Sequence, residues 1–262
     1  MIGERINPSG KKKLSASLQA GSLDIVRREA TSQVQAGAHV LDVNVAALGV
    51  DELAMLPEAV KAIMDLVNVP LCVDSTNPAA LEAALKVYKG KALVNSVSGE
   101  EQSLKTVLPI IKEYGAAVVG LTLDEKGIPA DADRRVEIAT KIVERAEKAG
   151  VPREDVVIDP LARTLAAESQ SGTAVLEAIR RIRAELGVNQ TLGASNVSFY
   201  MPDRHLLTGT FLAMALAAGV TCPIVDVAGS RPHILAADLI LGRDKHALKY
   251  IRAFRQTQKP KA

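Results

Sequence analysis

One pattern repeats along the whole sequence and constrains the fold more than any other feature. An amphipathic helical stretch ends at a glycine, a short run of β-branched and other apolar residues follows, and polar side chains come directly after that run. Glycine is favoured at such a point because a helix commonly ends in a left-handed residue. The glycines that follow helical stretches in this way are Gly37, Gly115, Gly150, Gly187 and Gly219. The pattern predicts regularly alternating helices and strands.

Eight apolar runs are strand candidates, and each is followed by a helical stretch. They cover residues 2–6, 39–45, 71–74, 92–95, 116–122, 156–159 and 223–227, with one more run that begins at Thr191. The runs are too uniformly apolar for strands of an antiparallel sheet with one solvent-exposed face, and they suit a parallel sheet covered by helices. Eight such units without a linker predict a single α/β domain, a (β/α)8 TIM barrel over residues 1–262. An open doubly wound sheet is the alternative, which the absence of a Gly-x-Gly-x-x-Gly turn disfavours.

Charge and composition exclude several classes of protein. Thirty-two basic against thirty acidic residues leave a net charge of +2, which gives no basis for nucleic-acid binding. We interpret the lysines at 11–13 and the tail at 259–261 as solvated ends. No apolar run approaches the ~20 residues that span a bilayer, and the first residues lack the pattern of a signal peptide. Cys72 and Cys222 lie in apolar runs and are expected to be buried free thiols, which predicts a cytoplasmic protein.

Polar residues gather at the carboxyl ends of the predicted strands, where TIM barrels hold their sites. No strand ends in a lysine, which disfavours a Schiff-base enzyme. The four histidines form no metal-binding spacing and both cysteines lie within apolar runs, so no metal site is expected. Carboxylates and carboxamides dominate the rim, which reads Glu4, Arg5, Asn7, Asp42, Asn44, Asp74, Asn77, Asn95, Ser96, Thr122, Asp124, Asp159, Ser195, Asn196, Ser198 and Asp226.

These residue types suit a flat heterocycle that is rich in nitrogen. A carboxylate accepts two hydrogen bonds from an edge that carries N–H beside NH₂, and a carboxamide both donates and accepts. The aminopyrimidine edge of a pterin has this pattern. Helix capping is the alternative for any single member of the rim, and Asp74 and Asp159 each stand where an N-cap could be.

The same segments resemble the pterin-binding methyltransferases, which include methyltetrahydrofolate:corrinoid protein methyltransferases and the folate module of cobalamin-dependent methionine synthase. The resemblance implies a TIM barrel, often a homodimer, that moves a methyl group between N5 of (methyl)tetrahydrofolate and the cobalt of a corrinoid protein. It also implies a cobalamin carried by a partner protein. The matching motifs occur in order, as Ile2-Gly-Glu-Arg-Ile-Asn7, Leu41-Asp-Val-Asn44, Val73-Asp-Ser-Thr-Asn77, Val94-Asn-Ser96, Tyr114-Gly-Ala-Ala-Val-Val119, Ile158-Asp-Pro160, Gly193-Ala-Ser-Asn-Val-Ser-Phe199 and Thr210-Phe-Leu-Ala-Met-Ala215.

Carried over by position, the resemblance assigns binding of the pterin ring to five residues. Asp74, Asn95 and Asp159 are similar to the residues that hold the ring through hydrogen bonds. Gly193 and Ser195 would lie along the pterin.

The resemblance also implies which residues serve the chemistry and the rest of the substrate. Asn196 would reach N5, so Asn196 and Asp74 are the catalytic candidates. Arg204 aligns with an arginine at the folate site, and Ile224 with an apolar pterin contact. Acetogen-type enzymes have glutamine at the position of Phe199, whereas the methionine-synthase module has phenylalanine there. Packing by Phe199 is therefore expected to replace a polar contact near the substrate.

Two other functions remain alternatives at the level of sequence. A dihydropteroate synthase shares the barrel and the pterin pocket, but that family has an Asn-x-Thr-x-Asp-Ser-Phe loop after the first strand, where this chain has Asn7-Pro-Ser-Gly10. A non-catalytic folate-binding subunit is the second alternative. The chain has no cobalamin-binding Asp-x-His-x-x-Gly segment, so the corrinoid is expected to come from a separate protein. The sequence leaves the direction of methyl transfer open.

Overall fold

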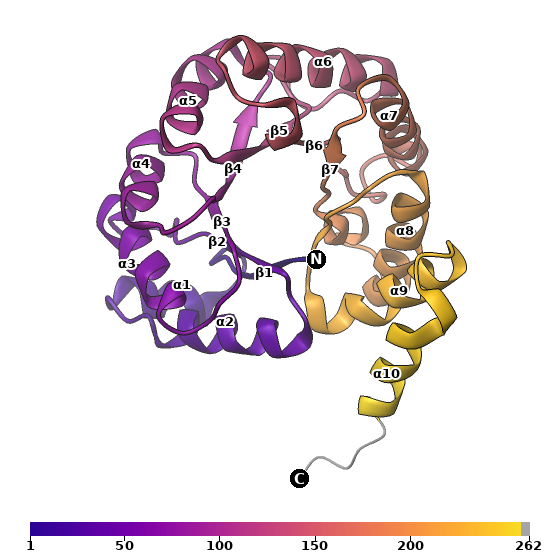
Figure 1. Cartoon of the computed structure of the whole chain (residues 1–262), viewed down its shortest axis with the longest axis horizontal. Coiled ribbons are helices and arrows are strands. Elements are labelled where there is room, and N and C mark those ends of the chain that lie inside the picture. The colour runs from indigo at the N-terminus through magenta and orange to yellow at the C-terminus, as the bar shows by residue number, and fades with distance from the viewer. Residues whose placement is uncertain (258–262) are drawn as a thin grey trace.

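Eight parallel strands form one sheet in the order β7-β6-β5-β4-β3-β2-β1-β8. The computed structural model describes residues 1–257, so the expectation for the lysines at 259–261 lies outside the described residues. Figure 1 shows the strands as an inner ring with the helices around it. The strands are β1 Ile2–Ile6, β2 Val40–Val43, β3 Leu71–Asp74, β4 Leu93–Ser98, β5 Ala117–Leu121, β6 Val156–Asp159, β7 Asn189–Gln190 and β8 Ile224–Val225.

The ring closes between the segment after β7 and strand β8. Gly193 and Ile224 form a parallel bridge, and the Ile224 amide donates to the Leu192 carbonyl at 2.9 Å. On the other side of β8, Ile2 pairs with Ile224 and Gly3 with Val225. The predicted TIM barrel is confirmed, and the open doubly wound alternative is wrong because that arrangement leaves both edge strands unpaired.

The helices surround the ring and agree closely with the helical stretches seen in the sequence. No helix within residues 1–257 has the length and apolarity to cross a membrane. The prediction did not include α1 or α10, and α10 extends away from the ring (Figure 1). The helices are α1 Lys12–Gln19, α2 Asp24–Ala36, α3 Glu52–Met64, α4 Pro78–Val87, α5 Glu101–Tyr114, α6 Ala132–Lys148, α7 Ser171–Glu185, α8 Arg204–Ala218, α9 Val227–Ile240 and α10 Leu248–Thr257, with 3₁₀ turns η1 Arg153–Asp155, η2 Ala194–Ser198 and η3 Lys245–Ala247.

The core lies where the apolar faces of the helices meet the strands. Helix α6 buries Ile138 and Ile142 completely, and Gly120 of β5 allows the helix to approach the sheet. A Cβ at Gly120 would lie 2.8 Å from Cγ2 of Ile142 and 3.0 Å from Cδ1 of Ile158. Each fully buried aliphatic side chain of this size contributes about 1.5–3 kcal/mol. This packing fixes the ends of β5 and β6, which carry polar residues of the rim.

The segment that begins at Thr191 differs from the prediction. Strand β7 occupies Asn189–Gln190, and the polar residues that were expected at a strand end lie on η2, Ala194–Ser198. Side chains in this segment bond to nearby backbone, as the Ser198 hydroxyl does by donating to the Ser195 carbonyl at 3.2 Å. Such local bonds offer the backbone an alternative to a strand ladder, so the chain coils as soon as the ring has closed.

Two expectations about single residues also need correction. Lys11 is not a solvated end, because its ammonium donates to the carbonyl of Arg5 at 3.0 Å and of Glu4 at 3.4 Å. Lys11 is the N-cap of helix α1, which begins at the next residue. The side chain of Lys11 therefore reaches back from the start of this helix to the backbone of β1. Cys72 is buried in β3 as expected, but Cys222 is only partly buried and precedes β8; both thiols are free.

Candidate functional site

A cluster of carboxylates and amides, Asp42, Asn44, Asp74 and Asn95, occupies the carboxyl ends of β2, β3 and β4. Asp74 and Asn95 face each other in register on neighbouring strands. The Asn44 amide donates to a carboxylate oxygen of Asp74 at 3.0 Å, and the Asn95 amide donates to one of Asp42 at 3.2 Å. Asp74 therefore has an amide donor from the end of the neighbouring β2, and Asp42 has one from β4, across β3, so the four side chains form one polar cluster.

Burial controls the protonation of the two acids in this cluster. Asp42 is 3% exposed, and burial raises its pKa to about 6 despite the hydrogen bond from Asn95. Burial, followed by the charge of Asp42, raises the pKa of Asp74 well above its ordinary value, which the bond from Asn44 only partly opposes. Two carboxyls this close cannot both be charged at little cost, so ionisation of one opposes ionisation of the other.

A second group, Asp159, Gly193 and Asn196, lies where β6 meets the segment after β7. Asp159 is 6% exposed and accepts from the Leu161 amide at 2.7 Å. Burial raises the pKa of Asp159 to about 6, which the backbone amides of Leu161 and Gly193 oppose. The Asn196 amide folds back over Gly193, because a Cβ at Gly193 would lie 3.0 Å from Nδ2 of Asn196. Asp159 and Asn196 thus flank the same glycine.

The fully buried Arg135 of α6 supports the turn that follows Asp159. Its guanidinium donates to the carbonyls of Pro160 at 2.9 Å and Leu161 at 3.0 Å, and twice to that of Pro129. The Leu161 amide of this turn donates a hydrogen bond to the Asp159 carboxylate. Arg135 therefore holds the backbone that orients the buried carboxylate.

We expect Arg135→Met to lower the free energy of unfolding by about 3 kcal/mol, because it leaves one buried and two partly buried carbonyls without a charged donor. Chemical denaturation measures this loss. The neighbouring Arg134, which bonds the buried Asp124 and the exposed Glu137, is the control. Arg134→Met should lower the free energy of unfolding clearly less than Arg135→Met does, because the Arg134 side chain is itself in contact with solvent. Equal losses for the two variants would contradict the role given to Arg135.

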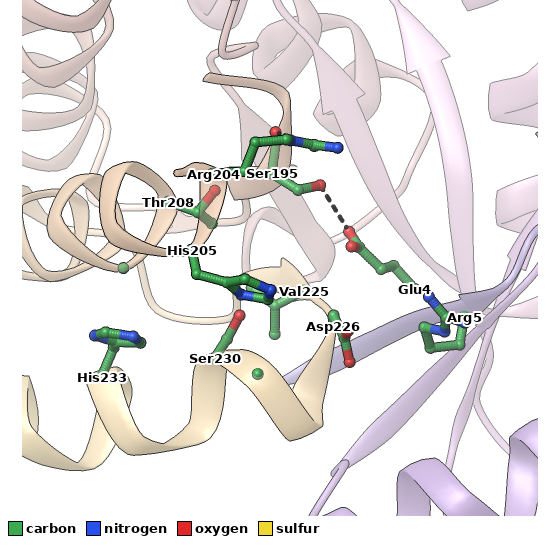
Figure 2. Close-up of a pocket in the computed structure, with 12 residues that line it drawn as sticks. Glu4, Arg5, Ser195, Arg204, His205, Thr208, Val225, Asp226, Ser230 and His233 are labelled. Carbon is green, nitrogen blue, oxygen red and sulfur yellow. Dashed lines mark hydrogen bonds between the residues drawn. The ribbon is translucent and has the colours of Figure 1, made fainter. Parts of the chain in front are cut away.

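A third group lies around a cavity of about 250 Å³ between β1, η2, α8 and α9. Figure 2 shows Glu4 reaching from β1 to Ser195, whose hydroxyl donates to the carboxylate at 3.2 Å. Burial raises the pKa of Glu4, and the bond from Ser195 opposes that rise. Arg204 donates to the Ser195 carbonyl at 3.1 Å and lies 4.5 Å from the centre of the exposed Phe199 ring. This cavity is polar and charged on several sides.

All nine residues proposed from the sequence lie at the strand-end rim of one barrel. Asp74 and Asn95 belong to the first cluster, whereas Asp159, Gly193 and Asn196 form the second. Ser195 and Arg204 line the cavity together with Glu4, and Phe199 stacks beside Arg204. Ile224 pairs with Gly193 across the closure of the ring. The cavity itself is not lined by Asp74, Asn95 or Asp159.

The capping alternative is wrong for Asp74 and Asp159. The N-cap of α4 is Asn77, whose side chain accepts from Ala79 and Ala80. Helix α7 begins at Ser171, well after Asp159. Asn77, which the sequence placed on the rim, is thereby a capping residue.

Sequence reasoning left Glu4, Asp42 and Asn44 out of the proposed site, although it placed them on the rim. Asp42 and Asn44 stand two residues apart at the end of β2, and side chains at that spacing share one face of a strand. This two-residue spacing was the signal by which the sequence could have added Asp42 and Asn44 to the proposed site. Glu4 had no such signal, because its partner Ser195 lies 191 residues away. Among residues 1–257, no group of three or more His, Cys, Asp and Glu side chains could hold a metal ion.

Residues 3–226 match the family described as pterin binding enzyme. The chain belongs to this family. A methylcorrinoid:tetrahydrofolate methyltransferase of Eubacterium limosum is 32% identical over 266 residues, which is 98% of this chain and 96% of that protein. A methionine synthase of Mycobacterium tuberculosis is 32% identical over 245 residues, which is 88% of this chain and 21% of that protein. The chain thus spans about a fifth of the methionine synthase.

Solved structures of other pterin-binding enzymes share the barrel. A Yersinia pestis dihydropteroate synthase with a sulfonamide drug superposes with a TM-score of 0.71 at 15% identity, covering 92% of this chain and 94% of the other. The Thermus thermophilus dihydropteroate synthase in complex with 4-aminobenzoate gives a TM-score of 0.67 at 24% identity, with 82% and 90% covered. At these identities the likeness concerns the fold alone.

Proposed function

We propose that this pterin-binding enzyme transfers a methyl group between N5 of tetrahydrofolate and the cobalt of a corrinoid carried by a separate protein. The observation that carries the proposal is the arrangement of Asp159 and Asn196 around Gly193. A buried carboxylate and an amide donor there lie within reach of one flat ligand. The similarity to a methylcorrinoid:tetrahydrofolate methyltransferase over 96% of that protein's length supports this function.

The rim has the chemistry that a reduced pterin needs. Asp159, Asp74 and Asn95 offer the acceptors and donors that match an aminopyrimidine edge, and binding of N–H groups favours the ionised form of a buried carboxylate. A dry, buried carboxylate also strengthens each such bond. The residues therefore fit a folate substrate, with Asn196 nearest to N5, Ile224 against the pterin, and Phe199 and Arg204 toward the outer part of the folate.

In the reaction, the methyl group leaves N5 as a cation equivalent and bonds to Co(I), which becomes methyl-Co(III), while N5 takes up a proton. In the reverse direction, methyl-Co(III) gives its methyl to N5, the N5 proton leaves, and Co(I) is released. An amine is a poor leaving group until charge at N5 is relieved. A hydrogen bond from Asn196 to N5 favours that change because it strengthens as the proton arrives. We assign Asp74, a carboxyl whose pKa is raised by burial, to the proton network around the pterin.

The proposal assigns the corrinoid to a partner protein that docks at the open mouth of the barrel. The short side chains Gly193, Ser195 and Asn196 leave room there for a bulky corrin face. The homodimer that the resemblance implies stays a prediction. Large exposed apolar side chains on α10 favour it, with Leu248 61% and Ile251 41% exposed.

Two rivals have less support. Dihydropteroate synthases share the fold, but at 15–24% identity among the structures compared above, whereas the methyltransferase reaches 32% over nearly the whole chain. A non-catalytic folate-binding subunit would need the same pterin contacts but no transfer chemistry.

An anaerobic spectroscopic experiment tests the proposal. The protein is mixed with methylcobalamin and tetrahydrofolate, and the cobalt spectrum is followed with product analysis. We expect methylcobalamin to be lost as Co(I) cobalamin and methyltetrahydrofolate appear. Tight folate binding without any change at cobalt, also with the corrinoid protein as methyl donor, would indicate the non-catalytic subunit. Formation of dihydropteroate from a pterin diphosphate and 4-aminobenzoate would indicate the synthase.

A further inference from the structure

A basic groove lies beside the mouth of the barrel, at the end of β1 between α1 and α2. It has a volume of about 420 Å³. Its charged residues are five cations and one carboxylate, although the whole chain carries only +2. We name it the basic groove, and its charged residues are Arg5, Lys11, Lys12, Lys13, Arg28 and Glu29.

The positive charge in this groove is mostly uncompensated. Arg5 approaches Glu29 at 3.6 Å, and Lys11 is used by two backbone carbonyls. Lys12, Lys13 and Arg28 have neither a hydrogen bond from their side chains nor an ion pair within residues 1–257. Basic residues elsewhere are commonly paired, as Arg145 is with Glu101. Unpaired cations in a concave surface create a field that attracts an anionic ligand.

The start of helix α1 adds to this field. Lys11 is its N-cap and makes no side-chain capping bond, and its first turn contains no acidic residue. Helices α2, α3, α5 and α6 have an acidic residue in the first turn, whereas α4, α7, α8, α9 and α10 lack one as α1 does. The amino end of a helix carries partial positive charge, so Lys12 and Lys13 are unfavourable there without an anion.

The basic groove is continuous with the site at the mouth through Arg5. Arg5 lines both the groove and the cavity that contains Ser195 and Arg204. A ligand whose ring is held at the rim can therefore run past Arg204 and Arg5 into the groove. A folate has that shape, with a pterin at one end and a glutamate at the other, to which further γ-linked glutamates can be added. Each added glutamate brings one carboxylate on a flexible chain.

We infer that the basic groove binds the γ-linked oligoglutamate tail of the folate substrate. This inference rests on the proposed function and names the form of the substrate that the site takes. An acidic surface of the corrinoid protein is the competing occupant. A concave groove of this volume suits a chain better than a broad protein surface, which needs about 800 Å² on each partner.

The test compares tetrahydrofolate with one glutamate and with three glutamates. Calorimetry gives the Kd of each for the wild type, for Lys12→Gln/Lys13→Gln, and for Arg28→Gln. The control Lys105→Gln/Lys148→Gln removes the same charge from α5 and α6. We expect the wild type and the control to bind the triglutamate at least about tenfold more tightly, with a ratio that falls as salt is added. In Lys12→Gln/Lys13→Gln the ratio should fall to within about threefold while the affinity for the monoglutamate is unchanged.

Several results would overturn the inference. The inference is wrong if the wild type binds the two folates with equal affinity. It is also wrong if the groove variants keep the preference for the triglutamate. A raised KM for the corrinoid protein in Lys12→Gln/Lys13→Gln, with the triglutamate preference intact, would assign the groove to protein docking. Failure of the monoglutamate to bind at all contradicts the proposed function instead, so the two failures are distinguishable.

Discussion

Asn196→Ala is expected to slow methyl transfer by at least ~100-fold while folate affinity stays within roughly tenfold. The amide is the donor nearest to the place assigned to N5, and its bond matters most when N5 becomes protonated. Loss of an interaction that strengthens in the transition state lowers the rate more than the binding. Single-turnover kinetics under anaerobic conditions, with the Kd measured separately, distinguish the two effects.

Two variants control this experiment. Asn189→Ala makes the same change at the exposed opposite end of the same segment, on β7, and should leave both rate and affinity unchanged. Gly193→Ala should displace the Asn196 amide, because the new Cβ would lie 3.0 Å from its Nδ2, and it should slow transfer in the same direction. Unchanged turnover in Asn196→Ala would remove that side chain from the mechanism.

Asp159→Asn is expected to weaken pterin binding by about 10- to 100-fold and to stabilise the free protein above neutral pH. Replacing the carboxylate by a neutral amide removes a charge-assisted hydrogen bond to the N–H edge of the pterin. Such a bond is worth about 1.5–3 kcal/mol. In the free protein the same carboxylate is buried, and burial raises its pKa to about 6 from the ordinary 3.8. Folding then costs on the order of 2–3 kcal/mol at high pH, a cost that the variant removes.

The pH dependence of that gain has a definite sign. Because the folded pKa of Asp159 lies above its unfolded value, the folded state binds the proton more tightly, and this group makes the wild type less stable as pH rises through about 4 to 6. Asp159→Asn should therefore resemble the wild type near pH 4 and exceed it in stability near pH 8. Denaturant titrations of the wild type and of Asp159→Asn across this pH range measure the difference. The comparison separates the contribution of Asp159 from those of Asp42 and Asp74, which both proteins retain.

Asp155→Asn is the matched control, since Asp155 precedes the opposite end of strand β6 and is paired with Lys91. It should leave pterin affinity unchanged. Wild-type affinity for the pterin should fall as pH drops below about 6, because the ligand requires the ionised carboxylate. Intact affinity in Asp159→Asn would contradict the role of Asp159 in pterin binding.

The sequence predicted the barrel because its signals are local. Each helix has a 3.6-residue apolar period, and each strand is a short apolar run bounded by a glycine and polar residues. Parallel strands place their carboxyl ends at the same edge, so the rim, including Asp74, Asn95, Asp159 and Asn196, followed from the order of elements alone. The one poorly placed strand was β7, where side-chain bonds to the backbone compete with strand pairing.

Contacts between distant segments could not be read from the sequence. The bond between Ser195 and Glu4 exists only because the ring closes, and Arg135 reaches the carbonyls after Asp159 only through the packing of α6 on β6. Lys11 looked like part of a solvated end, but its ammonium bonds the carbonyls of Glu4 and Arg5 on β1, whereas Lys12 and Lys13 are exposed as expected.

The amino-acid order by itself determined the class of fold, the edge that carries the site and the residue types that a pterin requires. Only the tertiary structure decided which carboxyls have their pKa raised by burial, which amide flanks Asp159, and where positive charge remains unpaired. The reason is physical: periodicity is a property of neighbours in the chain, whereas burial, pKa and charge pairing depend on every segment that packs around a group.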